Sequence, residues 1–420
     1  MQFVADFHIH SKYSRATSRD MDLEHLDKWA QIKGIKVLGT GDFTHPEWFK
    51  NLKEKLEPAE PGLFKLKQPA LNQEGDYTRF ILTTEISCIY SKKNRVRKIH
   101  IIIFVPSLEM ANKINASLGW IGNLKSDGRP ILGLDVKELT KIVLNVSPEC
   151  LIVPAHIWTP WFSLFGSRSG FDSIEECFDN YSSYIFAGET GLSSNPAMNW
   201  RLSALDRICL ISNSDSHSPQ KIGREANVFD TEISYKAILE AIKKKDPQKF
   251  LYTIEFYPEE GKYHYDGHRL CGISLSPTET KKYNGICPNC GKPLTIGVLN
   301  RVEELADRAE GSKPEKVIPF KSLVPLEEII ADALGVMPGT KQVEQEYKNL
   351  IGKFKNEFNV LISASLPELE SATLSEIAEG IIRVREGKVF IEPGYDGVYG
   401  KIKIFSQGEA RNPLKQGTLF

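Results

Sequence analysis

Three polar side chains recur with a period of two near the start of the chain, where Asp6, His8 and His10 alternate with apolar residues. The surrounding segment is apolar enough to form a buried strand, and side chains two residues apart on a strand point to the same face. Two imidazoles side by side at a strand end can hold a transition-metal ion. Such histidines can also be ordinary hydrogen-bonded or exposed side chains. The prediction of a metal site therefore depends on residues elsewhere in the chain.

Other residues able to bind a metal ion lie at the ends of apolar, strand-like runs in the first 220 residues. They are Asp42, His45, Glu85, His100, His156, Glu189, Asp215 and His217. Helical stretches lie between several of these runs, and alternating strands and helices predict a barrel or an open sheet of parallel strands. Barrels of this class build their active sites at the C-terminal ends of the strands. The sequence therefore predicts a polynuclear metal site at this edge.

Six motifs, in order over the same region, resemble those of the PHP (polymerase and histidinol phosphatase) family of metal-dependent phosphoesterases. They are residues 6–11 (Asp-Phe-His-Ile-His-Ser), 39–42 (Gly-Thr-Gly-Asp), 84–85 (Thr-Glu), His100, 154–156 (Pro-Ala-His) and 214–217 (Ser-Asp-Ser-His). The resemblance implies a distorted (β/α)7 barrel with up to three metal ions. By analogy, one ion is held by His8, His10, Glu85 and Asp215, a second by Glu85, His100 and His156, and a third involves His217.

Two positions depart from the family pattern, and both concern the third ion. Phe43 stands where the family usually has a histidine after the motif aspartate, and Ala16 stands where a further histidine often follows the first motif. We therefore expect Asp42 or His45 to hold the third ion together with His217, or this ion to bind weakly.

The predicted donors favour hydrolysis of a phosphate ester. Carboxylates that bridge two cations hold them about 3.5–4 Å apart, and such a pair activates water and stabilises charge on the leaving oxygen. The ions could be zinc, manganese or magnesium. We assign Asp215 a double catalytic role, as ligand and as base near the nucleophile. Glu189 either orients a ligand or is an ordinary strand-end residue, and Arg224 lies where it could hold a phosphate.

Two stretches beside the predicted donors could contact DNA. Residues 92–98 carry five positive charges, including Arg95, Arg97 and Lys98, and could bind a phosphate backbone or form a solvated hairpin. Trp158 and Trp161 belong to an aromatic cluster that could stack on bases or could be ordinary core.

A separate pattern beyond residue 260 has the spacing of a structural zinc site. His268 and Cys271 form one pair, and Cys287 and Cys290 form a second pair with the same separation. His264 could compete with His268 for the fourth position. The spacing predicts one structural zinc ion, in a module that could face nucleic acid or staple a domain junction.

Composition places the chain among soluble, globular proteins. Its 420 residues are 41% hydrophobic and 25% charged with a formal net charge of -1, so DNA contacts must come from local patches. The sequence has no apolar run long enough for a membrane span and no signal peptide at its start. Cys88, Cys150, Cys177 and Cys209 stand among apolar residues, as reduced core thiols do. We therefore expect a cytoplasmic, nucleoid-associated protein without membrane contact.

The change in character along the chain predicts four segments. They are a phosphoesterase domain (residues 1–250), a zinc-binding module (251–300), a mainly helical DNA-binding domain (301–405) and a flexible tail (406–420). In the tail, Gln416, Leu419 and Phe420 resemble the short peptide by which repair and replication enzymes dock on a sliding clamp.

This order of segments resembles the endonuclease Q family along essentially the whole chain. The stretches that carry the resemblance are residues 39–46, 159–161, 212–215, 294–299 and 301–306. The resemblance implies a DNA repair endonuclease that cuts on the 5′ side of uracil, hypoxanthine or xanthine, and at abasic sites.

On this basis we expect two or three divalent ions in the barrel, one structural zinc, and damaged DNA and a sliding clamp as partners. The oligomeric state is open, with a monomer expected. A phosphomonoesterase of the histidinol-phosphate type is the alternative, since it would explain the metal motifs but not the later segments. A binding protein with inert metals is a second alternative.

Overall fold

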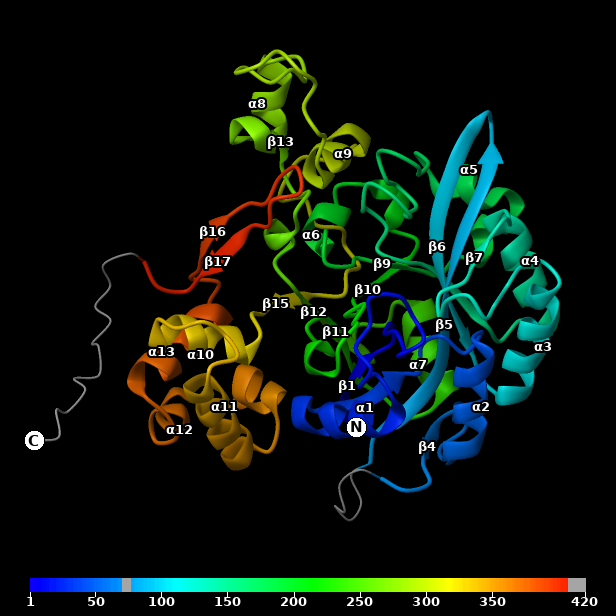
Figure 1. Ribbon diagram of the computed structural model, residues 1–420, viewed down its shortest axis with the longest axis horizontal. Coiled ribbons are helices and arrows are strands. Elements are labelled where there is room, and N and C mark those ends of the chain that lie inside the picture. Colours follow the sequence, from blue (N-terminus) through cyan, green and yellow to red (C-terminus); the bar gives the residue numbers. More distant parts are fainter. Residues whose placement is uncertain (70–76, 407–420) are drawn as a thin grey trace, which may run out of the picture.

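The computed structural model describes residues 1–69 and 77–406, and a closed barrel of strands lies at its centre (Figure 1). Its strands in chain order are β1 (Gln2–Asp6), β2 (Ile35–Gly39), β5 (Arg79–Lys92), β6 (Arg95–Val105), β8 (Leu151–Pro154), β9 (Ala187–Glu189) and β10 (Cys209–Ile211). Backbone pairing runs from β1 through β2, β5 and β6 to β8, and joins β9 to β10. Two contacts complete the ring, because the Ile157 N–H donates to the Glu189 carbonyl and Ile9 forms a parallel bridge with Ser216.

One barrel strand runs against the others. The pairs β1–β2, β2–β5 and β9–β10 are parallel, whereas β6 is antiparallel to both of its neighbours, β5 and β8. The long β5–β6 hairpin extends well past the barrel wall (Figure 1). This arrangement confirms the predicted distorted (β/α)7 barrel. It also explains why His100, at the midpoint of β6, can face the C-terminal ends of the other strands.

The barrel strands are buried on both faces because their apolar residues belong to two separate clusters. In β6, Ile102 and Phe104 join the inner cluster, whereas Ile101 and Ile103 join the cluster that includes the surrounding helices. Helices of that cluster include α1 (Leu23–Lys33), α2 (Pro46–Lys55), α3 (Leu108–Gly119) and α4 (Val136–Val146). Near-continuous apolar runs are what doubly covered strands require. Burial of each isoleucine stabilises the fold by about 1.5–3 kcal/mol.

Helix α4 illustrates how local sequence sets these covering helices. The Asp135 side chain accepts a hydrogen bond from the Lys137 N–H, which satisfies a donor that the first helical turn leaves free. Val136, Leu139 and Val143 recur at three- to four-residue spacing and are all buried. The helix therefore packs one apolar side on the barrel.

Shorter elements connect and extend the barrel. They are β3 (Leu56–Pro58), β4 (Phe64–Leu66), β7 (Ile131–Leu132), α5 (Ile174–Phe178), α6 (Pro196–Asn199), β11 (Ala226–Asp230), α7 (Tyr235–Lys244) and β12 (Phe250–Glu255). Strand β11 is antiparallel to both β1 and β12. Strand β15 (Phe320–Ser322) adds to β12 in parallel and ties the later part of the chain to the barrel sheet.

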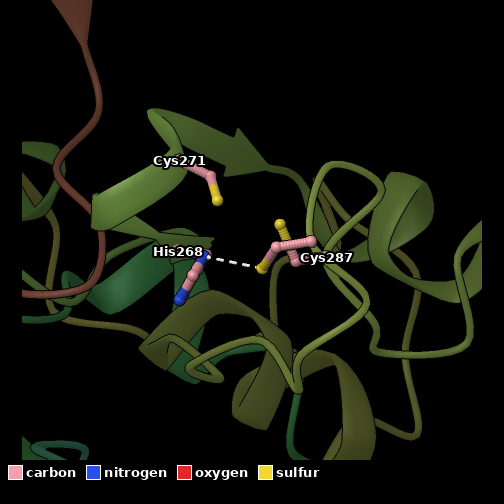
Figure 2. A group of neighbouring side chains, drawn as sticks. His268, Cys271 and Cys287 are labelled. Carbon is pink, nitrogen blue, oxygen red and sulfur yellow. Dashed lines mark hydrogen bonds between the residues drawn. The ribbon is translucent and has the colours of Figure 1, made fainter.

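The chain beyond β12 forms a small module that stands away from the barrel at the top of Figure 1. It contains β13 (Asp266–His268), β14 (Ile273–Leu275), α8 (Pro277–Lys282) and α9 (Val298–Leu305). The β13–β14 hairpin carries His268 and Cys271, and Cys287 faces them from the following loop (Figure 2).

The last described part is mainly helical and lies beside α1 (Figure 1). It contains α10 (Leu326–Leu334), α11 (Lys341–Phe354), α12 (Leu366–Glu370) and α13 (Ser375–Arg385), followed by the pair β16 (Phe390–Glu392) and β17 (Lys401–Lys403). A nearly buried ion pair of 2.6 Å joins Lys33 of α1 to Glu357 of this part. The boundaries of the four predicted segments remain a prediction. No helix in residues 1–69 and 77–406 is long and apolar enough to cross a membrane.

Candidate metal centres

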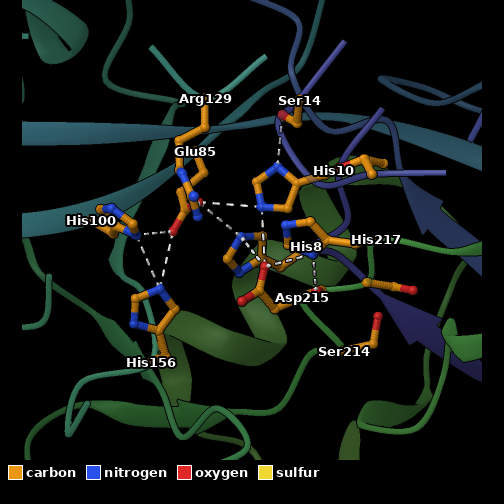
Figure 3. Close-up of polar contacts among 12 residues, drawn as sticks. His8, His10, Ser14, Glu85, His100, Arg129, His156, Ser214, Asp215 and His217 are labelled. Atoms are coloured by element: carbon orange, nitrogen blue, oxygen red, sulfur yellow. Dashed lines mark hydrogen bonds and ion pairs between the residues drawn. The ribbon is translucent and has the colours of Figure 1, made fainter. Parts of the chain in front are cut away.

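Four residues bring metal-binding atoms together at the C-terminal mouth of the barrel (Figure 3). They are His8, His10, Glu85 and Asp215. The His10 Nε2 lies 3.0 Å from Asp215 Oδ1 and 3.3 Å from Glu85 Oε2. The His8 Nε2 lies 3.6 Å from each of the same two oxygens. Two imidazole nitrogens and two carboxylate oxygens therefore face one small space, as the donors of a single ion must.

A second group of donors shares Glu85 with the first (Figure 3). The Glu85 Oε1 lies 2.8 Å from His100 Nδ1 and 3.1 Å from His156 Nε2. These two imidazole nitrogens are 3.2 Å apart. Because one Glu85 oxygen faces each group, this carboxylate is placed to bridge two neighbouring ions.

Buried carboxylates behind the rings fix their orientation. The His8 Nδ1 lies 3.0 Å from Glu189 Oε1, and the His10 Nδ1 lies 3.1 Å from Asp42 Oδ1. A ring that donates its Nδ1 proton to a carboxylate keeps the Nε2 lone pair free for a metal ion. The His8 Nε2 is buried and has no hydrogen-bond partner. This orphaned acceptor and the mixed nitrogen and oxygen donors fit a divalent cation.

Charge at the mouth also suits a cation. Burial opposes ionisation of Glu85, but His100, Arg129 and His8 hold the pKa of this carboxyl well below its usual value. Burial likewise opposes ionisation of Asp215, whose pKa is lowered by His8 and His10. Burial lowers the pKa of His100 to about 4, against the opposing influence of Glu85. Ionised carboxylates and a neutral imidazole are the forms that bind metal ions at neutral pH.

Three residues of the site have a left-handed backbone without being glycine. The φ angles are 48° for Asp42, 30° for His156 and 46° for Asp215. Such conformations cost about 1–3 kcal/mol each and persist where the surrounding structure imposes them. In each case the residue follows a barrel strand, so the turn aims its side chain at the other donors.

Arg129 is a functional candidate that the sequence analysis missed. It comes from the loop between α3 and β7, and its Nη1 donates to Glu85 Oε2 at 3.0 Å. The preceding Gly128 approaches so closely that an added Cβ would lie 2.2 Å from Asp42 Oδ2. The one feature of the sequence that could have pointed to Arg129 is a Gly-Arg pair within a polar insertion, and this feature is not specific.

The residues expected around a third ion do not come together. Both oxygens of Asp42 are engaged, one by His10 and the other by Ser11 and Ser14, so Asp42 orients His10 and is not placed as the predicted ligand. His45 stacks on Tyr13 with ring centroids 4.5 Å apart. Within the described residues, His217 belongs to no group of three or more donors. Its ring does lie 4.6 Å from that of His10.

Glu189 and Arg224 lie behind the donors rather than among them. Glu189 accepts hydrogen bonds from Asn213 at 2.9 Å and from the His156 N–H at 2.8 Å, in addition to its contact with His8. Of the two roles considered for Glu189, the geometry favours orientation of ligands. Arg224 donates through Nε and Nη2 to the Ser214 carbonyl at 2.9 and 2.8 Å. It therefore positions the backbone before Asp215, and its predicted phosphate contact remains a prediction.

The five residues predicted to contact DNA have different surroundings. Trp158 is fully buried and donates to Asn199 Oδ1 at 2.7 Å, so its predicted DNA contact is wrong. The prediction for Arg97 is also wrong, because this side chain stacks 4.1 Å over Phe171 and is largely buried. The remaining three are available at the surface: Arg95 and Trp161 are exposed, and Lys98 is half-buried over Phe162.

The zinc-site residues meet in the small module (Figure 2). The His268 Nδ1 lies 3.5 Å from the Cys290 Sγ, and Cys271 and Cys287 complete the group. Burial raises the pKa of Cys287, but the N–H groups of Cys290 and Asn289 lower it to about 7, toward the thiolate that zinc binds. His264 is buried outside this group, and His268 is the histidine that lies with the three cysteines. The predicted clamp peptide, Gln416, Leu419 and Phe420, lies outside the described residues.

Two family models match parts of the chain. Residues 200–247 match a model described as PHP-associated, and residues 325–388 match the MJ0043 C-terminal domain. The chain is 36% identical over 258 residues to the uncharacterized protein MJ0043 of Methanocaldococcus jannaschii, over 60% of this chain but only 32% of that protein. It is 31% identical over 420 residues to the uncharacterized protein YqxK of Bacillus subtilis, over 96% of this chain and 99% of that protein.

Solved structures extend the similarity to the whole fold. The crystal structure of the lesion-specific endonuclease PfuEndoQ from Pyrococcus furiosus has a TM-score of 0.85 and 31% identity, and covers 96% of this chain and 95% of its own. Endonuclease Q in complex with a 27-mer duplex carrying an abasic lesion at the active site has a TM-score of 0.83 and 31% identity. That match covers 96% of this chain and 97% of the other.

Proposed function

Because the chain belongs to the endonuclease Q family, we propose that it is a metal-dependent, lesion-specific DNA repair endonuclease. The lesions are abasic sites and the deaminated bases uracil, hypoxanthine and xanthine, and the cut falls on the 5′ side of the lesion. The abasic duplex bound at the active site of a related endonuclease Q supports the first of these substrates. The deaminated bases rest on the family resemblance.

One observation carries the proposal: Glu85 joins two groups of donors with a different oxygen facing each. A pair of divalent ions bound there would activate water and stabilise charge on the phosphate and on its leaving oxygen. The residues themselves supply a rigid frame, since carboxylates behind His8 and His10 lock both rings. Phosphoryl transfer is accelerated by groups that are already oriented and need no rearrangement during the reaction.

Two residues of the mouth reach solvent and can meet the substrate directly. The Asp215 side chain is 26% exposed, and its ionised carboxylate can accept a hydrogen bond from the attacking water and orient it. The Arg129 side chain is 29% exposed, and the guanidinium that binds Glu85 retains N–H groups that can donate to a phosphate oxygen.

DNA would lie across the mouth and along the β5–β6 hairpin, where basic side chains and an aromatic side chain are available for contact. Arg95 and Lys98 of the β5–β6 hairpin can bind the backbone, and Trp161 can stack on a base. An enzyme that inspects the edge of a base has to take that base out of the stack. We therefore expect the lesion nucleotide to leave the duplex before the cut.

The deciding experiment is a nicking assay on a labelled duplex with one deoxyuridine or one abasic site. Wild-type protein should cut immediately 5′ of the lesion, lose the activity on chelation, and regain it when divalent metal is restored. Asp215→Ala should slow the cut by about a thousandfold, since a lost metal ligand removes several kcal/mol of transition-state stabilisation. Asp230→Ala is the matched control, because Asp230 is 51% exposed and lies at the end of β11, outside the donor groups.

Two results would contradict the proposal. Equal cutting of unmodified and damaged duplex would remove the lesion specificity. Turnover of a phosphomonoester with no cut on any damaged duplex would replace the nuclease by the phosphatase alternative.

Two further proposals concern the partner of the C-terminal tail and the number of bound metal ions. We propose that Gln416, Leu419 and Phe420 dock on a sliding clamp, which a co-sedimentation assay with and without these residues would test. We propose zinc in the Cys-rich module and two ions in the barrel, which metal analysis of the purified protein would count.

A further inference from the structure

A tryptophan stands almost entirely in solvent on the loop that reaches into the metal centre. Trp120 is 93% exposed, whereas Trp48 and Trp158 are fully buried. Ile121 of the same loop is 38% exposed, and Ile131 at the start of β7, where the loop ends, is 54% exposed. Single exposed apolar side chains are common, but an indole presented this fully, on a segment with two further exposed isoleucines, is a candidate for a binding surface.

The backbone beneath Trp120 is fixed on both sides. Trp120 ends helix α3, and the next two N–H groups both donate to the Leu118 carbonyl, at 2.9 and 3.1 Å. Gly122 packs so closely on Leu132 of β7 that an added Cβ would lie 2.5 Å from its Cδ2. The indole is therefore held out by a rigid support and is not carried on a free loop.

The same loop then enters the metal centre. Gly128 lies against Asp42, and its N–H donates to the Tyr13 carbonyl at 3.0 Å. Arg129 follows and binds Glu85. The exposed indole and the arginine that binds the bridging carboxylate therefore belong to one continuous, anchored segment.

Exposed cations lie on the same loop as Trp120 and on the N-terminal segment that contacts this loop. Lys125 of the loop is exposed, as are Lys12 and Arg19 of the adjoining segment. Arg15 is 79% exposed and reaches the loop through Asp127 at 3.3 Å. A loop that carries both an exposed indole and cations suits a duplex, whose phosphates can meet the cations while its base steps admit the apolar group.

We propose that Trp120 is a wedge that enters the base stack beside the lesion and stacks in the space that the extruded nucleotide leaves. The inference rests on the proposed function and adds the residue that opens the duplex. Arg129 would then hold the phosphate while Trp120, on the same segment, keeps the neighbouring base pair from closing. The wedge matters only when a stack has to be opened, so its removal should spare substrates that are already open.

The test compares Trp120→Ala with wild-type protein on one lesion in two contexts, a matched duplex and a single strand. On the duplex, the variant should cut about 10- to 100-fold more slowly at saturating protein, which is the range for loss of one aromatic–base stack. On the single strand, the two proteins should agree within about twofold. Trp120→Phe should recover most of the duplex activity, because a smaller ring can still stack.

A second readout follows the opening itself. With 2-aminopurine placed beside the lesion and metal omitted, wild-type protein should raise its fluorescence on binding and Trp120→Ala should not. Tyr184→Ala is the matched control, since Tyr184 is an exposed aromatic residue, 47% accessible, on a different element. This control should behave as wild type in both assays.

Two results would overturn the proposal. Duplex cutting and fluorescence that Trp120→Ala leaves unchanged would assign the patch to another partner, such as a protein. An equal loss on duplex and single strand would make Trp120 a general binding residue and not a wedge. Absence of cutting by the wild-type protein would instead refute the proposed function, while the fluorescence comparison would still report on Trp120.

Discussion

The two candidate metal centres differ in how much of the fold each one needs. The barrel centre takes donors from after β1, from β5 and β6, and from the turns after β8 and β10. The zinc site takes its donors from residues 268–290 alone, on one hairpin and the loop that follows α8. The first is a product of the whole barrel, and the second is a local staple.

Burial follows the same division. His8, His10, Glu85, His100 and His156 are all buried, and carboxylates behind the first two rings hold them in place. In the zinc site Cys290 is exposed and Cys271 is half-buried. The barrel centre is therefore preorganised by its surroundings, whereas metal binding itself has to organise the module. Each centre should be separable from the other by substitution.

The largest effect is expected at Glu85, which both barrel groups share. Glu85→Gln keeps the shape but removes the bridging charge, and it leaves Arg129 beside an unpaired cluster of imidazoles. We expect nicking to fall by about a thousandfold or more and both barrel ions to be lost together. Single-turnover kinetics and metal analysis would measure the two effects.

The control for Glu85 is Glu175→Gln, an exposed carboxylate that pairs with Arg207 on the surface. It should leave nicking and metal content unchanged. Loss of one barrel ion with the other retained in Glu85→Gln would break the view of this centre as a single unit.

The next effect is expected behind the donors, at Glu189. Glu189→Gln weakens the hold on the His8 ring, and a partner of this kind is worth about 10- to 100-fold in metal affinity or activity. Glu225→Gln is the matched control, because this buried carboxyl lies outside the donor groups, and burial and the nearby Glu255 raise its pKa toward the neutral form that glutamine mimics. Equal effects of the two substitutions on a metal titration would show that Glu189 acts only through general packing.

A third prediction concerns the independence of the zinc module. Cys287→Ser removes one of its four donors, so the protein should lose one zinc ion, and hydrogen exchange should rise in residues 264–297. The barrel ions should remain. Cys88→Ser, which changes a buried thiol outside both centres, should retain the zinc. Loss of the barrel ions from Cys287→Ser would show that the two centres are coupled.

These sites also show which features a sequence reveals. The barrel donors could be predicted because each follows or lies on a strand, and the topology alone brings such positions to one edge. The zinc donors could be predicted because their spacing is short. In the first case the barrel topology brings the donors together, and in the second case the short spacing along the chain does so.

The errors lie where tertiary packing decides. Tryptophan and arginine are typical of DNA-binding surfaces, yet Trp158 is buried in the core and Arg97 packs over Phe171. Asp42 could be recognised as a site residue, but its place behind His10 depends on Ser11 and Ser14. Arg129 comes from a loop whose path no local pattern sets. Burial and loop geometry depend on many residues together, so they cannot be predicted from the type of a single residue.

The smallest effect is a pH dependence of the unfolding free energy. It arises at the zinc module, through His264, and does not involve the barrel centre. Burial lowers the pKa of this imidazole to about 4, so the folded protein keeps it neutral where the unfolded chain, with a pKa near 6.5, binds a proton. Its contribution to stability is therefore complete above pH 6.5 and is lost as pH falls toward 4, a change of at most about 3 kcal/mol. His264→Gln cannot titrate, so the difference in unfolding free energy between wild type and variant should shift over this window. Protonation of the cysteines of the zinc site at low pH affects both proteins alike, so the comparison cancels it. A pH-independent difference would show that His264 is solvated in the folded protein and that the module is looser than its packing implies.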